Sequence, residues 1–154
     1  TNSRTQTIGI LATQGTLNSE LFNKTTEIYR DTKIIEQVGH GLVQLIESGN
    51  IDSLEMTKLL QEYLKPMIEA NIDYLVLGCS HYPYLIPQLK KILPPNIQII
   101  DSGEAVARQT QNVLKEKVGL SGLKNGEPLF YTNSDPKVLS EILGYKYKVI
   151  EKDF

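Results

Sequence analysis

Short apolar runs alternate with segments of helical spacing along most of this chain, and no other feature limits its folding more. Runs of strand character occupy residues 8–12, 33–36, 73–77, 97–100, 129–132 and 147–150. Helices are predicted over residues 17–29, 39–48, 52–70, 82–93, 104–117 and 135–143. Strands that alternate with helices build layered α/β domains. We therefore predict an α/β fold with a mainly parallel sheet flanked by helices.

The first strand and the longest helix give the strongest local signals. Residues 8–12 are continuously apolar, as expected of a strand covered on both faces. The helix begins at a capping residue, Asp52 or Ser53, and carries one apolar stripe. The stripe consists of Met56, Leu59, Leu60, Tyr63, Leu64 and Met67. Pro66 has no amide hydrogen, so we expect it to kink or shorten the helix near its end.

Composition and charge exclude several classes of protein. Of the 154 residues, 40% are hydrophobic and 22% charged, which is typical of a soluble globular domain with its own core. The net charge is -2 with both signs interspersed, so we expect neither a nucleic-acid nor a membrane partner. The first seven residues are polar rather than a secretory signal, and a single cysteine cannot form an internal disulfide. We expect a cytoplasmic protein, with a polar linker at residues 121–127.

Three polar turns follow predicted strands, at residues 13–16, 79–81 and 101–103. In open α/β sheets ligands bind beyond the carboxyl ends of the strands. These turns therefore mark the predicted ligand edge. Their shared position is a stronger indication of a site than any one turn alone.

Cys79 is the most informative single residue. It lies between a predicted buried strand and a predicted helix, whose free amide groups would favour a thiolate. His81, two residues on, could stabilise that thiolate or pass a proton. The alternative is that Cys79 is a small buried filler and that His81 has no direct role.

Other polar residues are more ambiguous. Glu47 closes a predicted helix, where the helix charge disfavours a carboxylate, although a solvated glutamate explains it as well. Thr13 and Thr16 offer hydroxyl groups suited to a carboxylate, and ordinary turn chemistry explains them equally. We interpret Asp101 as a helix cap and His40 as a surface or capping residue. With two histidines, one cysteine and no clustered spacing, the sequence gives no support for a metal site.

Four segments, in order along the chain, resemble one family. Residues 77–83, Leu-Gly-Cys-Ser-His-Tyr-Pro, resemble the Gly-Cys-Thr-His-Tyr-Pro signature of glutamate racemases, within the aspartate/glutamate racemase superfamily. Residues 12–16 resemble the Thr-x-Gly-Thr turn of that family, residues 42–49 its Val-x-x-x-Glu-x-Gly segment, and residues 100–103 its second Asp-Ser-Gly. The resemblance is firm to about residue 115 and looser beyond it.

The resemblance implies interconversion of L- and D-glutamate, without metal or organic cofactor, to supply D-glutamate for peptidoglycan synthesis. Two acid/base groups must flank the inverted carbon, one as a thiolate and one as a thiol. By this resemblance Cys79 is the second thiol, acting on L-glutamate with help from His81. Ser80 and His81 would bind the substrate, together with Thr13 and Thr16. Glu47 matches an acidic position near the family's active site.

The sequence also departs from the family. Ser80 replaces the usual threonine, and Val-Gly-His at 38–40 stands where Ala-Cys-Pro is common. The first thiol, in a Cys-Asn-Thr motif, and the opening Asp-Ser-Gly turn are absent. We therefore expect residues 1–100 to form one racemase-like domain and residues 101–154 to complete another. We expect no racemisation by this chain alone, and residues after about 101 shifted, disordered or packed against another copy. A homodimer stays open.

Two further interpretations stay open. The chain could belong to a racemase of aspartate or another acidic amino acid, which turnover of the two substrates by the intact enzyme would decide. It could instead be a non-catalytic binding module that kept a racemase-like fold. Alkylation of Cys79 across a pH series would separate that module from an enzyme, because only a catalytic thiol needs activation.

Overall fold

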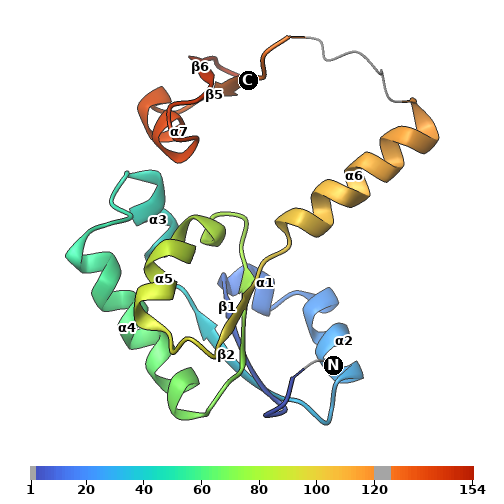
Figure 1. Ribbon diagram of the computed structural model, residues 1–154, viewed down its shortest axis with the longest axis vertical. Coiled ribbons are helices and arrows are strands. Elements are labelled where there is room, and N and C mark those ends of the chain that lie inside the picture. Colours follow the sequence, from blue (N-terminus) through green and yellow to red (C-terminus); the bar gives the residue numbers. More distant parts are fainter. Residues whose placement is uncertain (1–2, 120–125) are drawn as a thin grey trace.

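The computed structural model describes residues 3–119 and 126–154, and it contains a four-stranded parallel sheet in the order β2-β1-β3-β4 (Figure 1). A separate parallel pair joins β5 and β6. The strands are β1 (Thr7–Ala12), β2 (Lys33–Val38), β3 (Tyr74–Gly78), β4 (Gln98–Ile100), β5 (Leu129–Thr132) and β6 (Lys148–Glu151). The helices are α1 (Gln14–Leu17), α2 (Glu20–Ile28), α3 (Leu42–Glu47), α4 (Leu54–Glu69), the 3₁₀ helix η1 (Tyr82–Leu85), α5 (Ile86–Ile92), α6 (Gly103–Lys117) and α7 (Pro136–Ile142). The predicted mainly parallel α/β fold is confirmed.

The main core lies between the sheet and α3, α4, η1 and α5. Leu11 of β1 with Leu75 and Leu77 of β3 supplies the face of the sheet. The predicted stripe of α4 covers it: Met56, Leu60, Leu64 and Met67 are fully buried. The helix is not shortened at Pro66, and α4 continues to Glu69. The fully buried Leu64 and Met67 hold this turn against the core despite the missing amide hydrogen.

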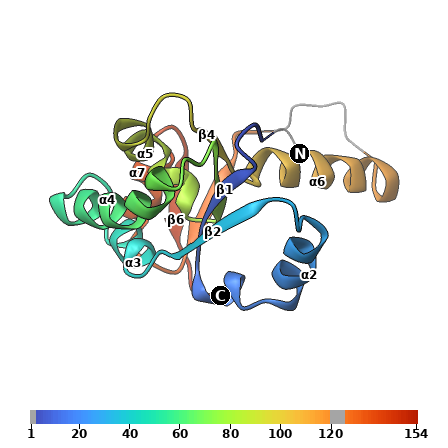
Figure 2. The ribbon, with the colours of Figure 1, turned by 90° about the horizontal axis from the view of Figure 1, so that it is seen from below.

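The opposite face of the sheet carries a smaller core. It joins Ile10, Ala12 and Leu17 with partly buried residues of β1, β2, β3 and α2. Figure 2 shows α4 and α5 on one side of the sheet and α2 on the other. No residue of α2 is buried, and a cavity of about 360 Å³ lies between this helix and the strands.

Asp73, just before β3, fixes the start of the described chain. Its carboxylate accepts hydrogen bonds from Ser3 Oγ at 2.7 Å and from the backbone amides of Arg4 and Thr5. Burial opposes ionisation of this carboxyl group, but the hydrogen bonds outweigh burial and lower the pKa of Asp73. The interaction ties the entry of β1 to β3.

The C-terminal segment is organised differently. Helix α6 extends away from the sheet and has no buried residue, and β5, α7 and β6 form a small unit beside α3 (Figure 1). Ile142 of α7 packs against the main core. The predicted linker lies largely outside the described residues, at 121–125. Among the helices of residues 3–119 and 126–154, none is long and apolar enough to cross a membrane.

Candidate active site

Cys79 follows directly after the last residue of β3, at the carboxyl edge of the sheet, as predicted. Gly78, the last residue of β3, is in register with Ala12 of β1. A Cβ atom on Gly78 would lie 2.7 Å from the Cβ atom of Ala12, which is closer than side chains tolerate. Glycine therefore lets β1 and β3 end side by side, with Cys79 next to the turn that follows β1.

That turn carries Thr13 and Thr16. It was predicted to be a polar turn and forms the one-turn helix α1, in which the Thr13 hydroxyl accepts a hydrogen bond from the Thr16 amide at 3.3 Å. The two hydroxyl groups lie 3.0 Å apart. The methyl group of Thr16 is 3.5 Å from where a Gly78 side chain would begin. The structure thus brings the Thr13–Thr16 turn and the Cys79 turn together.

The segment after Cys79 differs from the prediction. A single helix was expected from residue 82, whereas η1 (Tyr82–Leu85) precedes α5 (Ile86–Ile92). Pro83 and Pro87 lack the amide hydrogens that a continuous α-helix needs in these turns. Instead, the amide of Tyr82 donates to the Cys79 carbonyl oxygen at 3.2 Å. The expected long helix dipole therefore does not begin at Cys79.

His81 joins the thiol to an acidic residue. Its Nδ1 atom lies 4.0 Å from Cys79 Sγ and 3.3 Å from Ser80 Oγ. Its Nε2 atom lies 3.1 Å from Glu47 Oε1. The thiol and the His81 ring are partly buried, whereas the Glu47 side chain is 61% exposed. Three candidate side chains thus form one series, with imidazole between sulfur and carboxylate.

The contact between Glu47 and His81 arises from core packing. Glu47 is the last residue of α3, one position after the fully buried Ile46. His81 directly precedes Tyr82, which is also fully buried. Both buried side chains belong to the main core, so α3 and η1 are held against each other. Glu47 is therefore more than a solvated helix-end residue.

Tyr82 packs against Gly39, which lies in the Val-Gly-His segment that departs from the family. The Tyr82 hydroxyl donates a buried hydrogen bond to the Gly39 carbonyl oxygen at 3.1 Å. A side chain on Gly39 would collide with that hydroxyl. Burial, followed by the negative charges of Cys79 and Tyr63, raises the pKa of Tyr82 to about 12. Tyr82 thus stays protonated and serves the packing beneath the site.

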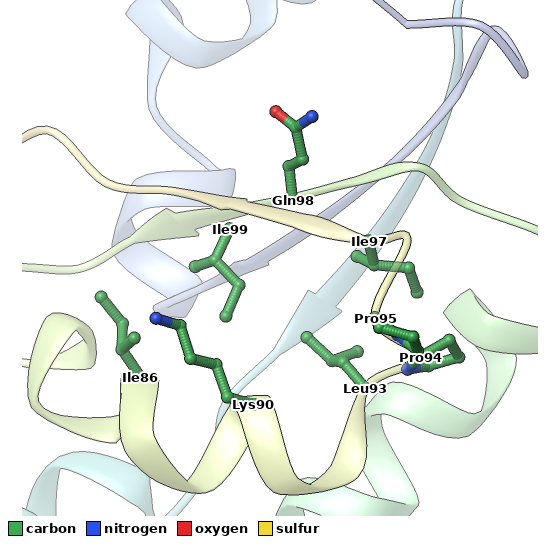
Figure 3. A pocket seen from close by; sticks show the side chains of 8 residues that line it. All are labelled: Ile86, Lys90, Leu93, Pro94, Pro95, Ile97, Gln98 and Ile99. Carbon is green, nitrogen blue, oxygen red and sulfur yellow. The ribbon is translucent and has the colours of Figure 1, made fainter.

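The remaining predicted residues lie apart from this series. Asp101 accepts a hydrogen bond from the Gly103 amide at 2.7 Å, but Ser102, not Asp101, takes the N-cap position of α6. His40 is exposed, as expected. Within residues 3–119 and 126–154 no three His, Cys, Asp or Glu side chains could hold a metal ion. A cavity of about 620 Å³ between α5 and β4 contains none of the candidate residues (Figure 3).

Comparisons with known proteins agree on one family. Residues 1–110 match the family model described as Asp/Glu/Hydantoin racemase. A glutamate racemase of Pseudomonas putida is 42% identical over 142 residues, covering 92% of this chain and 54% of the relative. One of Pseudomonas syringae pv. tomato is 37% identical, covering 93% of this chain and 52% of the relative. The chain thus spans about half the length of these curated relatives.

Solved structures give the same result. A glutamate racemase of Bacillus anthracis is 27% identical with a TM-score of 0.77, covering 99% of this chain and 59% of the other. One of Francisella tularensis, in complex with D-glutamate, is 25% identical with a TM-score of 0.77. The match covers 97% of this chain and 57% of the other. Both similarities extend over the C-terminal segment as well as the main sheet.

Proposed function

Because the chain belongs to the Asp/Glu/Hydantoin racemase family, we propose that it forms one acid/base half of a glutamate racemase. The observation that carries this proposal is the series Cys79–His81–Glu47 at the carboxyl edge of β3. Its product, D-glutamate, would supply peptidoglycan synthesis in the cytoplasm. The names of the curated relatives favour glutamate over aspartate as the substrate.

The proposed reaction needs only proton transfers. The Cys79 thiolate removes the α-proton of L-glutamate and becomes a thiol, leaving a carbanion. A second thiol on the opposite face donates its proton to that carbon, which yields D-glutamate and a second thiolate. The chain has one cysteine, so the second thiol must come from protein outside these 154 residues.

His81 would tune the sulfur in this scheme. If His81 donates its Nε2 hydrogen to Glu47, the Nδ1 lone pair faces Cys79 and can accept the thiol proton. The Glu47 carboxylate then stabilises the imidazolium, and the imidazolium stabilises the thiolate. Orientation of a base by a carboxylate is a general device for activating a nucleophile.

The hydroxyl groups beside the thiol would hold the substrate. Ser80 is exposed next to Cys79, and the Thr13–Thr16 turn lies across the edge of the sheet from it. We assign Ser80, His81, Thr13 and Thr16 to the carboxylate and amino groups of glutamate. Their donors on one side of the substrate leave the opposite face open to the second thiol.

Residues 101–154 are assigned to the lobe that carries this second thiol. The β5–β6 pair is parallel and two-stranded, and parallel sheets are normally larger and covered on both faces. Helix α6 leaves Val106, Val113 and Leu114 exposed by 59%, 36% and 41%. An isolated helix of its 15 residues is only marginally stable in water. These surfaces would pack on the second lobe or, in its absence, on another copy in a homodimer.

The test is circular dichroism of L- and D-glutamate incubated with purified protein, with aspartate in parallel. The 154-residue chain should not racemise either amino acid. A protein that also contains the second lobe should racemise glutamate, and Cys79→Ser should abolish that activity. Sustained turnover by the 154-residue chain would contradict the two-thiol proposal.

A further inference from the structure

A cavity of about 430 Å³ connects the proposed acid/base series to the C-terminal unit. Glu47 and His81 line it from one side, and the loop 132–135 after β5 lines it from the other. Val138 and Leu139 of α7 complete the wall. Residues more than 80 positions apart in sequence therefore share this space, which adjoins the pair that supports Cys79.

The polar groups in this cavity can be matched one by one. Thr132 Oγ1 already accepts a hydrogen bond from the backbone amide of Ser134 at 3.1 Å. Asp135 Oδ1 likewise accepts one from the backbone amide of Lys137 at 2.9 Å. Among the described residues, the side-chain amide of Asn133 and the hydroxyl of Ser134 donate no hydrogen bond. Glu47 contacts His81 through Oε1, and its Oε2 atom has no donor within the same described part of the chain. The Tyr84 hydroxyl also lines the cavity and donates no hydrogen bond among the described residues. Asn133 and Ser134 thus supply donors in the cavity that borders Glu47 Oε2, from the side opposite His81.

We propose that Asn133 and Ser134 are positioning residues that hold Glu47, directly or through water, in line with His81. This inference rests on the proposed role of the Cys79–His81–Glu47 series. Glu47 is largely exposed, and without a second contact its carboxylate would rotate freely against solvent. A hydrogen bond to Oε2 fixes the carboxylate plane and keeps Oε1 on the imidazole. Docking of the C-terminal unit then becomes part of the activation of Cys79.

The test uses the only cysteine of the 154-residue chain as the reporter. The rate of Cys79 alkylation by iodoacetamide is measured from pH 6 to pH 9, with intact folding checked by circular dichroism. Glu47→Ala should slow the reaction at pH 7 by roughly two- to tenfold, the net worth of one typical hydrogen bond, because Glu47 is largely exposed. The loop variant Asn133→Ala/Ser134→Ala should slow it by part of that factor. Adding the loop changes to Glu47→Ala should slow it no further.

A matched control removes two exposed amide side chains elsewhere on the surface, as Asn96→Ala/Asn112→Ala, and should react like the wild type. Ser134→Thr keeps the hydroxyl and should preserve the rate. If Glu47→Ala slows the reaction and the loop variant does not, the loop has no positioning role. An additive effect in the Glu47→Ala background would overturn the inference too. If Glu47→Ala itself reacts at the wild-type rate, the proposed role of the Cys79–His81–Glu47 series is refuted, and with it the basis of this inference.

Discussion

Substituting Gly78 with alanine should test the close approach that brings Cys79 to the Thr13–Thr16 turn. The new Cβ atom would lie 2.7 Å from the fully buried Cβ atom of Ala12, and neither atom belongs to a flexible side-chain end. Overpacking of this kind costs about 1–3 kcal/mol. Replacing a glycine inside a strand contributes about 0.5–1 kcal/mol in the other direction. The free energy of unfolding should therefore fall by about 1–2 kcal/mol.

The register pairs Gly78 with Ala12, so a compensating change exists. Ala12→Gly/Gly78→Ala moves one methyl group from β1 to β3 and removes the clash. Its stability should lie within about 1 kcal/mol of the wild type, since one strand glycine replaces another. The coupling energy in the double-mutant cycle should be about 1–3 kcal/mol, the whole overpacking cost.

Urea denaturation of the four proteins, followed by far-ultraviolet circular dichroism, measures this cycle. Alkylation of Cys79 in the same proteins reports whether the sulfur moves when the strands are forced apart. The reasoning is refuted if Gly78→Ala is as stable as the wild type. It is refuted equally if the double variant is no more stable than Gly78→Ala.

Four further predictions concern the scaffold. Asp73→Asn should destabilise the chain in urea at neutral pH and progressively less as the pH falls below about 4, because the stabilisation by a carboxylate with a lowered pKa is complete above its ordinary pKa and is lost as the pH falls through the lower folded-state pKa. Tyr82→Phe should cost about 1–2 kcal/mol in urea denaturation, because the Gly39 carbonyl oxygen loses its buried partner. In the wild type, ultraviolet titration should show one tyrosine ionising near pH 12, with its stabilising effect present below about pH 10 and lost as the pH rises through that midpoint. Backbone amides of α6 (Gly103–Lys117) should exchange with deuterium far faster than those of α4, since α6 has no buried residue.

Local patterns predicted most of the main sheet and the position of its site. Short apolar runs gave all four of its strands, and the stripe of α4 gave four fully buried side chains. The polar turns fell at the carboxyl edge because parallel strands end there together. Local pattern failed at η1, where two prolines interrupt the hydrogen-bond series of a helix, and at Pro66, which does not shorten α4 because buried neighbours hold that turn on the core.

The contacts that organise the site could not be predicted from spacing. Glu47 meets His81 across 34 positions, and Tyr82 bonds to Gly39 across 43. Both contacts depend on how α3 and η1 pack over the sheet, and neither segment carries a local pattern that specifies the other. The family resemblance did indicate Glu47, but not that imidazole would lie between its carboxylate and the sulfur.

The C-terminal segment lies next to residues of the main domain that are far from it in sequence. Its strands pair only with each other, yet α7 packs through Ile142 onto the main core and the loop before it faces Glu47 and His81. A segment that we propose for one lobe thus borders the proposed acid/base series of the other. In a racemase with two opposed thiols, such a segment links the two halves mechanically. A shift of β5 and α7 would then change the position of the Glu47 carboxylate first and, through His81, the environment of the Cys79 sulfur.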